Sequence, residues 1–290
     1  MQSFNSFLKE EAFLLEEVSA LMEKLITFGG QAYPNYGNIV VMAGGAGSGK
    51  GFVLSNLVGV EGKVFDVDEL KTLASKTPAI KRRVASELGI DIEDLAKNLK
   101  DPKNVETLHD VMGNYLQLDK RKERAFYRGV IAAPEDRKPN IIFDMTFKEL
   151  SKLQKVAQDA SKLGYDKKNI HIVWVVNDIE VAQAQNAKRA RTVPSEILVN
   201  THRGAANTMG DIINMGNKLK KYMDGDIVFA FNKVGVDAKL VKSGKGGSYV
   251  KDANYFYVKR AGKAPTSIDK LDKTIRQKIK SYVPKNVDWN

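Results

Sequence analysis

Short apolar runs alternate with amphipathic segments through the middle of the chain. Five of these runs have the length of a buried strand, and they lie at 38–43, 63–65, 140–144, 170–176 and 226–231. Between them, apolar residues recur at helical spacing in the segments that follow each run. Strands that alternate with helices are joined by crossover connections, which place the strands parallel. The pattern therefore predicts an α/β fold with a doubly wound, parallel, five-stranded sheet.

Three further segments lie outside this alternation. Residues 6–28 repeat apolar positions at helical spacing and end at Gly29-Gly30, which predicts an amphipathic helix. Residues 79–132 read as helical pieces broken near Gly89 and near Asp101-Pro102. The tail reads as a strand at 249–260 and a basic helix at 267–282.

These patterns predict three parts in the chain. The first is an N-terminal amphipathic helix within residues 1–33. The second is a main domain over 34–231, which carries the helical insertion at about 79–132. The third is a basic C-terminal α+β appendage over 232–290.

A glycine-rich loop separates the first strand from the helix that follows it. It matches the spacing G-x-x-x-x-G-K and reads Gly44-Gly45-Ala46-Gly47-Ser48-Gly49-Lys50-Gly51. Glycines let the backbone N–H groups turn inward around a phosphate, and the new helix adds its positive end. Lys50 places an ammonium near the outer phosphates. The loop predicts a P-loop NTPase-like fold that binds ATP; the alternative is a glycine-rich turn that binds nothing.

Gly51 occupies the position at which such loops usually carry a Ser or Thr hydroxyl for magnesium. The loop resembles that of adenylate kinases, which also have glycine directly after the lysine. Asp144 ends the third apolar run and is our candidate for holding Mg²⁺ together with water. Thr146 follows it, either beside the metal and substrate or as the N-cap of a helix that starts at Phe147.

Two carboxylates follow the second predicted strand. Ligands of doubly wound sheets bind beyond the carboxyl ends of the strands, where Asp66 and Asp68 are expected to lie. Asp68 is our candidate for the base that accepts the proton of an attacking hydroxyl, and Lys71 follows one helical turn later. The alternative interpretation is that Asp66 or Asp68 caps the next helix.

A cluster of cations lies between two predicted helices at about 186–194. Lys188, Arg189 and Arg191 occupy three of four consecutive positions there. The planar guanidinium group matches the oxygens of a phosphate, so the segment suits a lid that closes over phosphates during transfer. The alternative is an exposed basic turn.

Taken together, these motifs resemble those of P-loop kinases of the zeta-toxin and bacteriophage polynucleotide-kinase type. The shared motifs are the glycine loop, a D-x-x-[KR] element at Asp68-Glu69-Leu70-Lys71 and a V-P-x-x-[IV]-L element at Val193–Leu198. The resemblance covers about 38–231 and implies that Asp68 activates the acceptor hydroxyl while Lys71 assists. It also implies that Lys50, Arg189 and Arg191 hold the phosphates of ATP.

The composition excludes some kinds of site and bears on the location of the protein in the cell. The chain has 290 residues, 43% of them hydrophobic, and no cysteine, so disulfides and cysteine metal sites are excluded. No apolar run reaches the roughly 18 residues that span a bilayer, and the N-terminus does not read as a secretory signal. We expect a cytoplasmic protein without membrane association, in the host cytoplasm if a phage encodes it. The oligomeric state is left open.

Positive charge is concentrated in the tail. The net charge of the chain is +11, and residues 232–290 carry 14 Lys and Arg against 5 Asp and Glu, a net of +9. This asymmetry indicates a polyanionic partner such as nucleic acid, or else a solvated lysine-rich surface. Tyr255, Phe256 and Tyr257 can stack on bases there, although such aromatics more often form core.

The expected function is therefore an ATP-dependent kinase. It would transfer the γ-phosphate to a hydroxyl of a nucleic acid or nucleotide-like acceptor and would be encoded by a phage. One alternative is a zeta-toxin-like UDP-sugar kinase. The other is a nucleotide-binding phage structural or adaptor protein without kinase activity.

Overall fold

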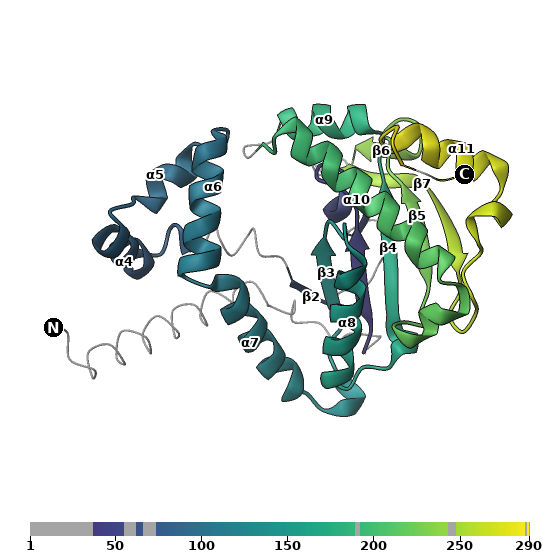
Figure 1. Ribbon diagram of the computed structural model, residues 1–290, viewed down its shortest axis with the longest axis horizontal. Coiled ribbons are helices and arrows are strands. Elements are labelled where there is room, and N and C mark those ends of the chain that lie inside the picture. Colours follow the sequence, from purple (N-terminus) through teal and green to yellow (C-terminus); the bar gives the residue numbers. More distant parts are fainter. Residues whose placement is uncertain are drawn as a thin grey trace. The chain divides into compact units, whose positions relative to one another are not determined.

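The computed structural model describes residues 37–54, 62–65, 74–188, 192–242, 248–287 and 289 (Figure 1). Contacts within the chain divide it into two compact units. The first, called the insertion unit, holds the described residues from 63 to 134. The second, called the sheet unit, holds the described parts of 33–62, 135–189 and 193–290. The predicted N-terminal helix lies outside the described residues.

The sheet unit is built on four parallel strands. In order along the chain they are β1 (Ile39–Ala43), β3 (Ile141–Met145), β4 (Ile170–Val176) and β5 (Ile227–Phe231). In space β1 lies between β3 and β4, and β5 follows β4. Ala43 pairs with Met145 on one side and with Trp174 on the other. The carboxyl ends of these strands therefore meet at one edge, where β1 runs into the glycine loop.

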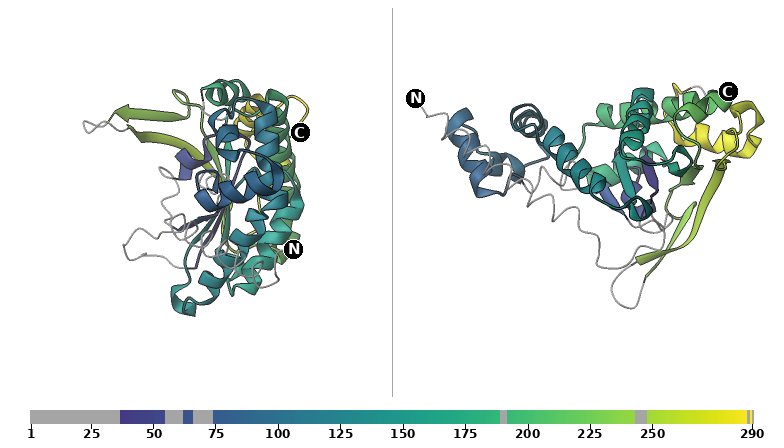
Figure 2. Two further views of the ribbon diagram at one scale, coloured as in Figure 1. Left: turned by 90° about the vertical axis from the view of Figure 1, so that its left-hand side faces the viewer. Right: turned by 90° about the horizontal axis from the view of Figure 1, so that it is seen from below.

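Two strands of the tail pair in the antiparallel direction. β6 (Ala238–Lys242) pairs with β7 (Ser248–Lys259), and β7 pairs with β5. The predicted parallel arrangement is confirmed for β1, β3, β4 and β5, but the tail strands, predicted as a separate appendage, extend this sheet and make it mixed. β6 and β7 are antiparallel to each other because the connection between them is too short to join parallel strands. Figure 2 shows β6 and β7 as a long ribbon that projects from the unit.

Helices cover one face of this sheet (Figure 1, Figure 2). α8 (Leu150–Lys162) and α10 (Ser195–Asn214) contact each other there, and α11 (Lys273–Tyr282) packs its Tyr282 ring against Phe231 of β5. α8 buries Leu153, Val156, Ala157 and Ala160, the spacing of an apolar helical face. The second helical layer that a doubly wound sheet requires stays a prediction.

A buried tryptophan joins the end of the described chain to this core. The ring of Trp289 stacks on Trp174 of β4 at 5.3 Å between centroids and meets Phe229 of β5 edge to face at 5.8 Å. Its indole N–H donates to the carbonyl of Ala206 on α10 over 3.2 Å. The indole therefore fills the space between sheet and helix with its only polar group paired.

Short helices complete the sheet unit. They are η3 (Glu135–Arg137), η4 (Lys167–Asn169), α9 (Ile179–Ala187), η5 (Gly216–Lys221), η6 (Ile268–Lys270) and α2, which begins at Lys50 and is described to Val53.

The insertion unit contains β2 (Lys63–Phe65) and a series of helices. These are α4 (Pro78–Leu88), α5 (Ile92–Lys97), α6 (Pro102–Asp110), the π-helical turn η2 (Val111–Tyr115) and α7 (Leu118–Ile131). Gly89 ends α4 in the left-handed conformation, and the carboxylate of Asp101 accepts from the N–H of Lys103 at the start of α6. The two predicted breaks thus coincide with a helix end and a helix start.

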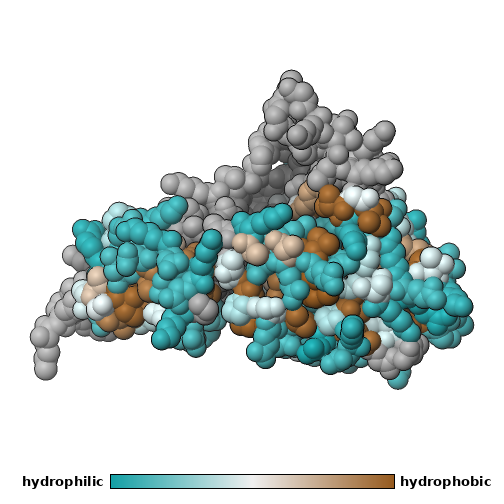
Figure 3. All heavy atoms as spheres, turned by 90° about the horizontal axis from the view of Figure 1, so that it is seen from above, coloured by the Kyte–Doolittle hydropathy of each residue, from teal (hydrophilic) through white to brown (hydrophobic). Residues whose placement is uncertain are grey.

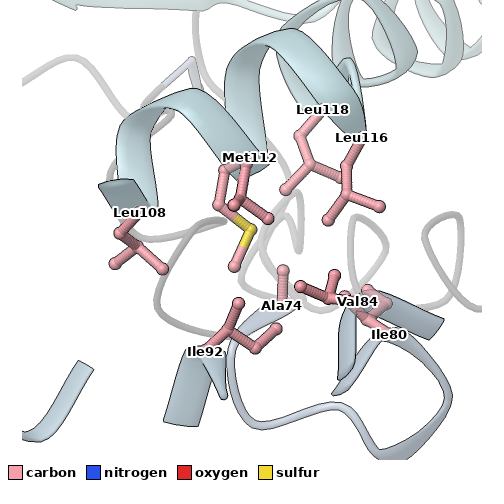
Figure 4. Packing of buried hydrophobic residues seen from close by; sticks show 9 residues of the cluster. Ala74, Ile80, Val84, Ile92, Leu108, Met112, Leu116 and Leu118 are labelled. Carbon is pink, nitrogen blue, oxygen red and sulfur yellow. The ribbon is translucent and has the colours of Figure 1, made fainter. Parts of the chain in front are cut away.

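The helices of this unit surround a small hydrophobic core of their own (Figure 4). Its buried members come from α4, α5, α6, η2 and the segments around them, and they are Ala74, Ile80, Val84, Ile92, Leu108, Val111, Met112, Leu116 and Leu118. Because these side chains pack on one another, the segment buries its own apolar surface.

Hydrophilic side chains predominate among the described residues on the face drawn in Figure 3, with apolar residues interspersed. Across the described ranges, no helix combines the length and the apolar character that crossing a bilayer requires.

Candidate functional site

The glycine loop connects β1 to α2 with a backbone that only glycine adopts easily. Gly47 and Gly49 have φ angles of 73° and 86°, and Gly49 immediately precedes α2. A Cβ atom on Gly49 would lie 2.2 Å from the side-chain nitrogen of Asn232. The positive φ and this close approach together explain why glycine occupies the position before Lys50.

Lys50 brings the loop and the neighbouring strand together. Its ammonium donates to the carbonyl of Gly44 over 3.1 Å and lies 3.5 Å from a carboxylate oxygen of Asp144. Lys50 and Asp144 are both largely shielded from solvent, with side chains 13% and 26% exposed. Two of the predicted site residues thus form an ion pair at the carboxyl edge of β1 and β3.

The position after Lys50 offers no ligand. A Cβ atom on Gly51 would meet nothing within 4 Å, and the residue is exposed. Across the described residues, no group of three or more His, Asp or Glu side chains gathers as a metal site would require. Asp144, which pairs with Lys50, is therefore our candidate for holding a cation at this edge of the sheet.

α10 supports the glycine loop through a contact that the sequence analysis missed. The N–H of Ala46 donates to the hydroxyl of Thr201 over 3.0 Å, and that hydroxyl donates to the carbonyl of Leu198. His202 Nε2 lies 2.8 Å from the carbonyl oxygen of Ala46, and a Cβ atom on Gly45 would lie 2.0 Å from the same ring. Thr201 and His202 therefore determine where the loop backbone lies.

The segment after β5 supports the loop from another side. The side-chain nitrogen of Asn232 donates to the carbonyl of Ser48 over 2.8 Å, while its main-chain N–H donates to Val176 at the end of β4. Lys233 follows and pairs with Asp178, with 2.7 Å between Nζ and the carboxylate. No sequence motif marks these residues, because each contact joins segments far apart in the chain.

Asp178 also begins α9. Its carboxylate accepts from the N–H groups of Glu180 and Val181. Burial raises the pKa of Asp178, but the hydrogen bonds from Lys233 and from these two amides outweigh burial and hold the pKa below its usual range. The ends of β4 and β5 are thus joined by an ionised carboxylate beside the loop.

The ends of the predicted lid are anchored to each other. The side chain of Asn186 donates to the carbonyl of Val193 over 2.7 Å and accepts from the N–H of the same residue over 2.9 Å. Asn186 is buried, so this pair determines where the intervening segment leaves α9 and re-enters α10. Arg189 and Arg191 lie outside the described residues, as do Asp66, Asp68 and Lys71.

Thr146 is partly exposed just after β3. The alternative that it caps a helix starting at Phe147 is wrong, since α8 begins at Leu150 with Glu149 at its N-cap position. Phe147 is buried with a φ of 55°, a left-handed conformation that a bulky residue adopts rarely and that a helix cannot include. The strained turn lies two residues beyond the end of β3.

The buried imidazole of His202 makes stability depend on pH. Burial lowers the pKa of His202, and Lys50 acts in the same direction, whereas the hydrogen bond to Ala46 opposes them. The unfolded chain then binds the proton more readily than the folded chain. The stabilisation is complete above the unfolded pKa of about 6.5 and is lost as the pH falls through the folded value.

We therefore expect the free energy of unfolding in urea to fall between about pH 7.5 and pH 5 by more in the wild type than in His202→Gln. His109→Gln, at an exposed histidine of α6, is the matched control. An identical pH dependence in the wild type and His202→Gln would contradict the assignment.

No family model matches this sequence, and no curated protein matches it. Among solved structures, the chain is similar to AvrRxo1-ORF1:ORF2 crystallised with ATP, at 11% identity over 96% of this chain and 72% of that chain, with a TM-score of 0.48. The same complex with sulphate ions gives 10% identity, 96% and 73% coverage and a TM-score of 0.46.

A second similar structure belongs to the PezAT chromosomal toxin–antitoxin system of Streptococcus pneumoniae. It is 15% identical over 75% of this chain and 76% of that chain, with a TM-score of 0.47. At these TM-scores and identities the likenesses assign no family and no activity to the chain. The functional conclusion therefore depends on its own residues.

Proposed function

We propose that the chain is a P-loop phosphotransferase that moves the γ-phosphate of ATP to an acceptor hydroxyl. The observation that carries the proposal is the ion pair of Lys50 with Asp144 at the mouth of the glycine loop. A lysine at the end of such a loop reaches the outer phosphates, and a carboxylate at the end of the neighbouring strand suits a magnesium ion. Phosphoryl transfer requires both kinds of group within reach of the same phosphates.

The described loop fits the phosphates of ATP. Positive φ angles at Gly47 and Gly49 allow a tight turn of backbone N–H groups around an anion. Thr201, His202 and Asn232 support this backbone from outside, through the N–H of Ala46 and the carbonyls of Ala46 and Ser48. The loop is thus preorganised, and the charge of Lys50 is added to it.

The carboxyl edge of β1 and β3 suits a magnesium ion that has a single protein ligand. Asp144 would hold the ion, and water and phosphate oxygens would supply the remaining ligands, as is common for magnesium beside nucleotides. Gly51 adds no oxygen, so the site depends on Asp144 more than a loop with a hydroxyl would. The bound ion would neutralise charge on the phosphate oxygens during transfer.

The sequence motifs supply the remaining roles of the proposal. Asp68 would accept the proton of the acceptor hydroxyl, while Asp66, Lys71 and Thr146 would contact the acceptor. Arg189 and Arg191 would hold the phosphates from the lid, whose ends Asn186 and Val193 keep together. A hydrolase would need no acceptor-binding set of this kind, so the motifs support a kinase.

The acceptor is proposed to be a hydroxyl of a nucleic acid or nucleotide. The test is transfer of label from γ-labelled ATP to a panel of acceptors: single- and double-stranded DNA with 5′-hydroxyls, hydroxymethylated DNA, RNA, nucleosides, nucleoside monophosphates and UDP-sugars. Label on the nucleic acids or nucleotides supports the proposal, and label on UDP-sugars alone supports the zeta-toxin-like alternative. ATP binding without transfer to any acceptor would favour a structural or adaptor role.

Asp68→Asn separates binding from chemistry. The amide keeps the shape of the carboxylate but accepts no proton, so we expect transfer to fall by about 10²–10⁴-fold while ATP affinity is retained. The checks are label transfer and equilibrium binding of ATP by the same preparation. Asp94→Asn, at an exposed aspartate of α5 with no role in the proposal, is the matched control and should leave transfer unchanged. Full turnover by Asp68→Asn would refute the assignment of the base.

A further inference from the structure

One face of α7 carries three cations in a row. Lys120, Arg124 and Arg128 follow one another at intervals of four residues, and all three side chains are exposed. Residues at this spacing are neighbours on a helix surface and are about 6 Å apart along the axis. The three residues are called the α7 ridge here. It runs for about 12 Å along the insertion unit.

The cations of the ridge have no partners in the described part of the chain: none of them makes an ion pair or a side-chain hydrogen bond there. Some other cations of the same unit are paired, as Lys81 is with Glu93 and Arg83 is with Glu87. Like charges four residues apart destabilise a helix. An anionic ligand on the ridge would relieve this repulsion.

The opposite side of α7 cannot insert into a membrane. Leu118, Phe126 and Val130 are buried, so the apolar face of the helix is already occupied within the protein. An amphipathic helix that inserts at a lipid surface instead buries its apolar face among the lipids. On the ridge side, Ile131 is 63% exposed and the ring of Tyr127 is partly exposed. Aromatic surface beside cations is typical of contacts with nucleic-acid strands.

The tail has a larger charge, but part of it is neutralised within the protein. Lys259 pairs with Asp224 and Lys233 pairs with Asp178, two acids that lie outside the tail and are not counted in its net charge. Arg260 lies over the ring of Tyr257 at 3.3 Å from its centroid, which covers that aromatic face. The positive charge that the tail has available for a polyanion is therefore smaller than its net charge.

We propose that the α7 ridge binds the phosphate backbone of a nucleic acid. A strand of B-form DNA carries one phosphate per 3.4 Å of helix axis, so about 12 Å of strand presents at least as many phosphates as the ridge has cations. The binding itself is independent of the proposed phosphotransferase activity. We also propose that the ridge holds the strand whose hydroxyl is the acceptor. Only this role depends on the phosphotransferase activity.

The experiment measures the affinity of the full chain for a labelled oligothymidylate, and for the same length of duplex, by fluorescence anisotropy without ATP. The salt concentration is varied between about 50 and 200 mM. The triple variant Lys120→Gln, Arg124→Gln, Arg128→Gln removes the ridge charge and keeps good helix formers. We expect its affinity at low salt to fall by at least tenfold, and the slope of log affinity against log salt to fall by about 2–3.

The matched control removes the same charge from the tail, as Lys263→Gln, Lys270→Gln, Lys273→Gln. An equal loss in this variant, or an unchanged affinity in the ridge variant, would overturn the proposal, as would binding of the wild type to phosphatidylserine vesicles but to no oligonucleotide. Thermal unfolding verifies that both variants fold. The binding measurement contains no ATP, so it does not depend on phosphoryl transfer. A chain that binds the oligonucleotide but transfers no phosphate would refute the proposed phosphotransferase activity and leave the proposal for the ridge intact.

Discussion

Lys50→Ala should reduce phosphoryl transfer on the order of a thousandfold. In the wild type the ammonium is held by the carbonyls of Gly44 and Gly45 and lies 3.5 Å from Asp144. Truncation removes the positive charge that would stabilise the phosphates during transfer. It also leaves the carboxylate of Asp144 to repel them. The measurement is the rate of label transfer from γ-labelled ATP at saturating acceptor, together with the affinity for ATP.

Lys152→Ala is the matched control, because it removes a lysine from the exposed surface of α8 and should leave both quantities unchanged. Lys50→Arg keeps the charge but replaces a compact ammonium by a planar fork that has a different reach. We expect this variant to retain ATP binding and to lose most of the rate. Wild-type turnover by Lys50→Ala would exclude the glycine loop as the site of phosphoryl transfer.

Asp237→Ala should lower the free energy of unfolding by about 3 kcal/mol. The carboxylate is fully buried after β5, where it accepts from the hydroxyl of Tyr282 over 2.7 Å and from the N–H of Lys233 over 3.2 Å. It also pairs with Lys278 of α11 and accepts from the side chain of Asn254 on β7. Removing it leaves several donors without an acceptor, which costs more than the loss of one average contact.

The change is measured by urea unfolding near neutral pH. Asp269→Ala, at an exposed aspartate, is the matched control and should change the free energy by less than about 0.5 kcal/mol. Asp237→Asn preserves the shape and should cost less than alanine. A loss below about 1 kcal/mol in Asp237→Ala would show that the network around the carboxylate contributes little. Because Asn232 precedes this network, we also expect weaker ATP binding in Asp237→Ala.

Local patterns predicted the strands that form the site. The apolar runs that contain β1, β3, β4 and β5 are short and rich in β-branched residues, and the structure has a strand in each. The position of Asp144 also followed from sequence, because a residue at the end of a parallel strand lies at the ligand-binding edge. Such signals depend on neighbouring residues and can be read from one segment at a time.

The residues that support the glycine loop could not be predicted in this way. The contact between His202 and Ala46 spans 156 positions, and that between Asn232 and Ser48 spans 184. Which segments meet across such distances is decided by the packing of α10 and the order of the strands. The start of α8 was missed for a different reason, since nothing in the sequence marks Phe147 as left-handed.

The ribbon of β6 and β7 has a consequence for how the protein behaves at high concentration. Among the described strands β6 has one neighbour, so one side of it presents unpaired N–H and C=O groups to other molecules. A free edge of this kind invites strand pairing between copies and then aggregation. Two of its five residues, Lys239 and Lys242, are lysine, which natural sheets use at their edges to discourage such pairing. Protection of this edge against aggregation thus explains part of the positive charge of the tail.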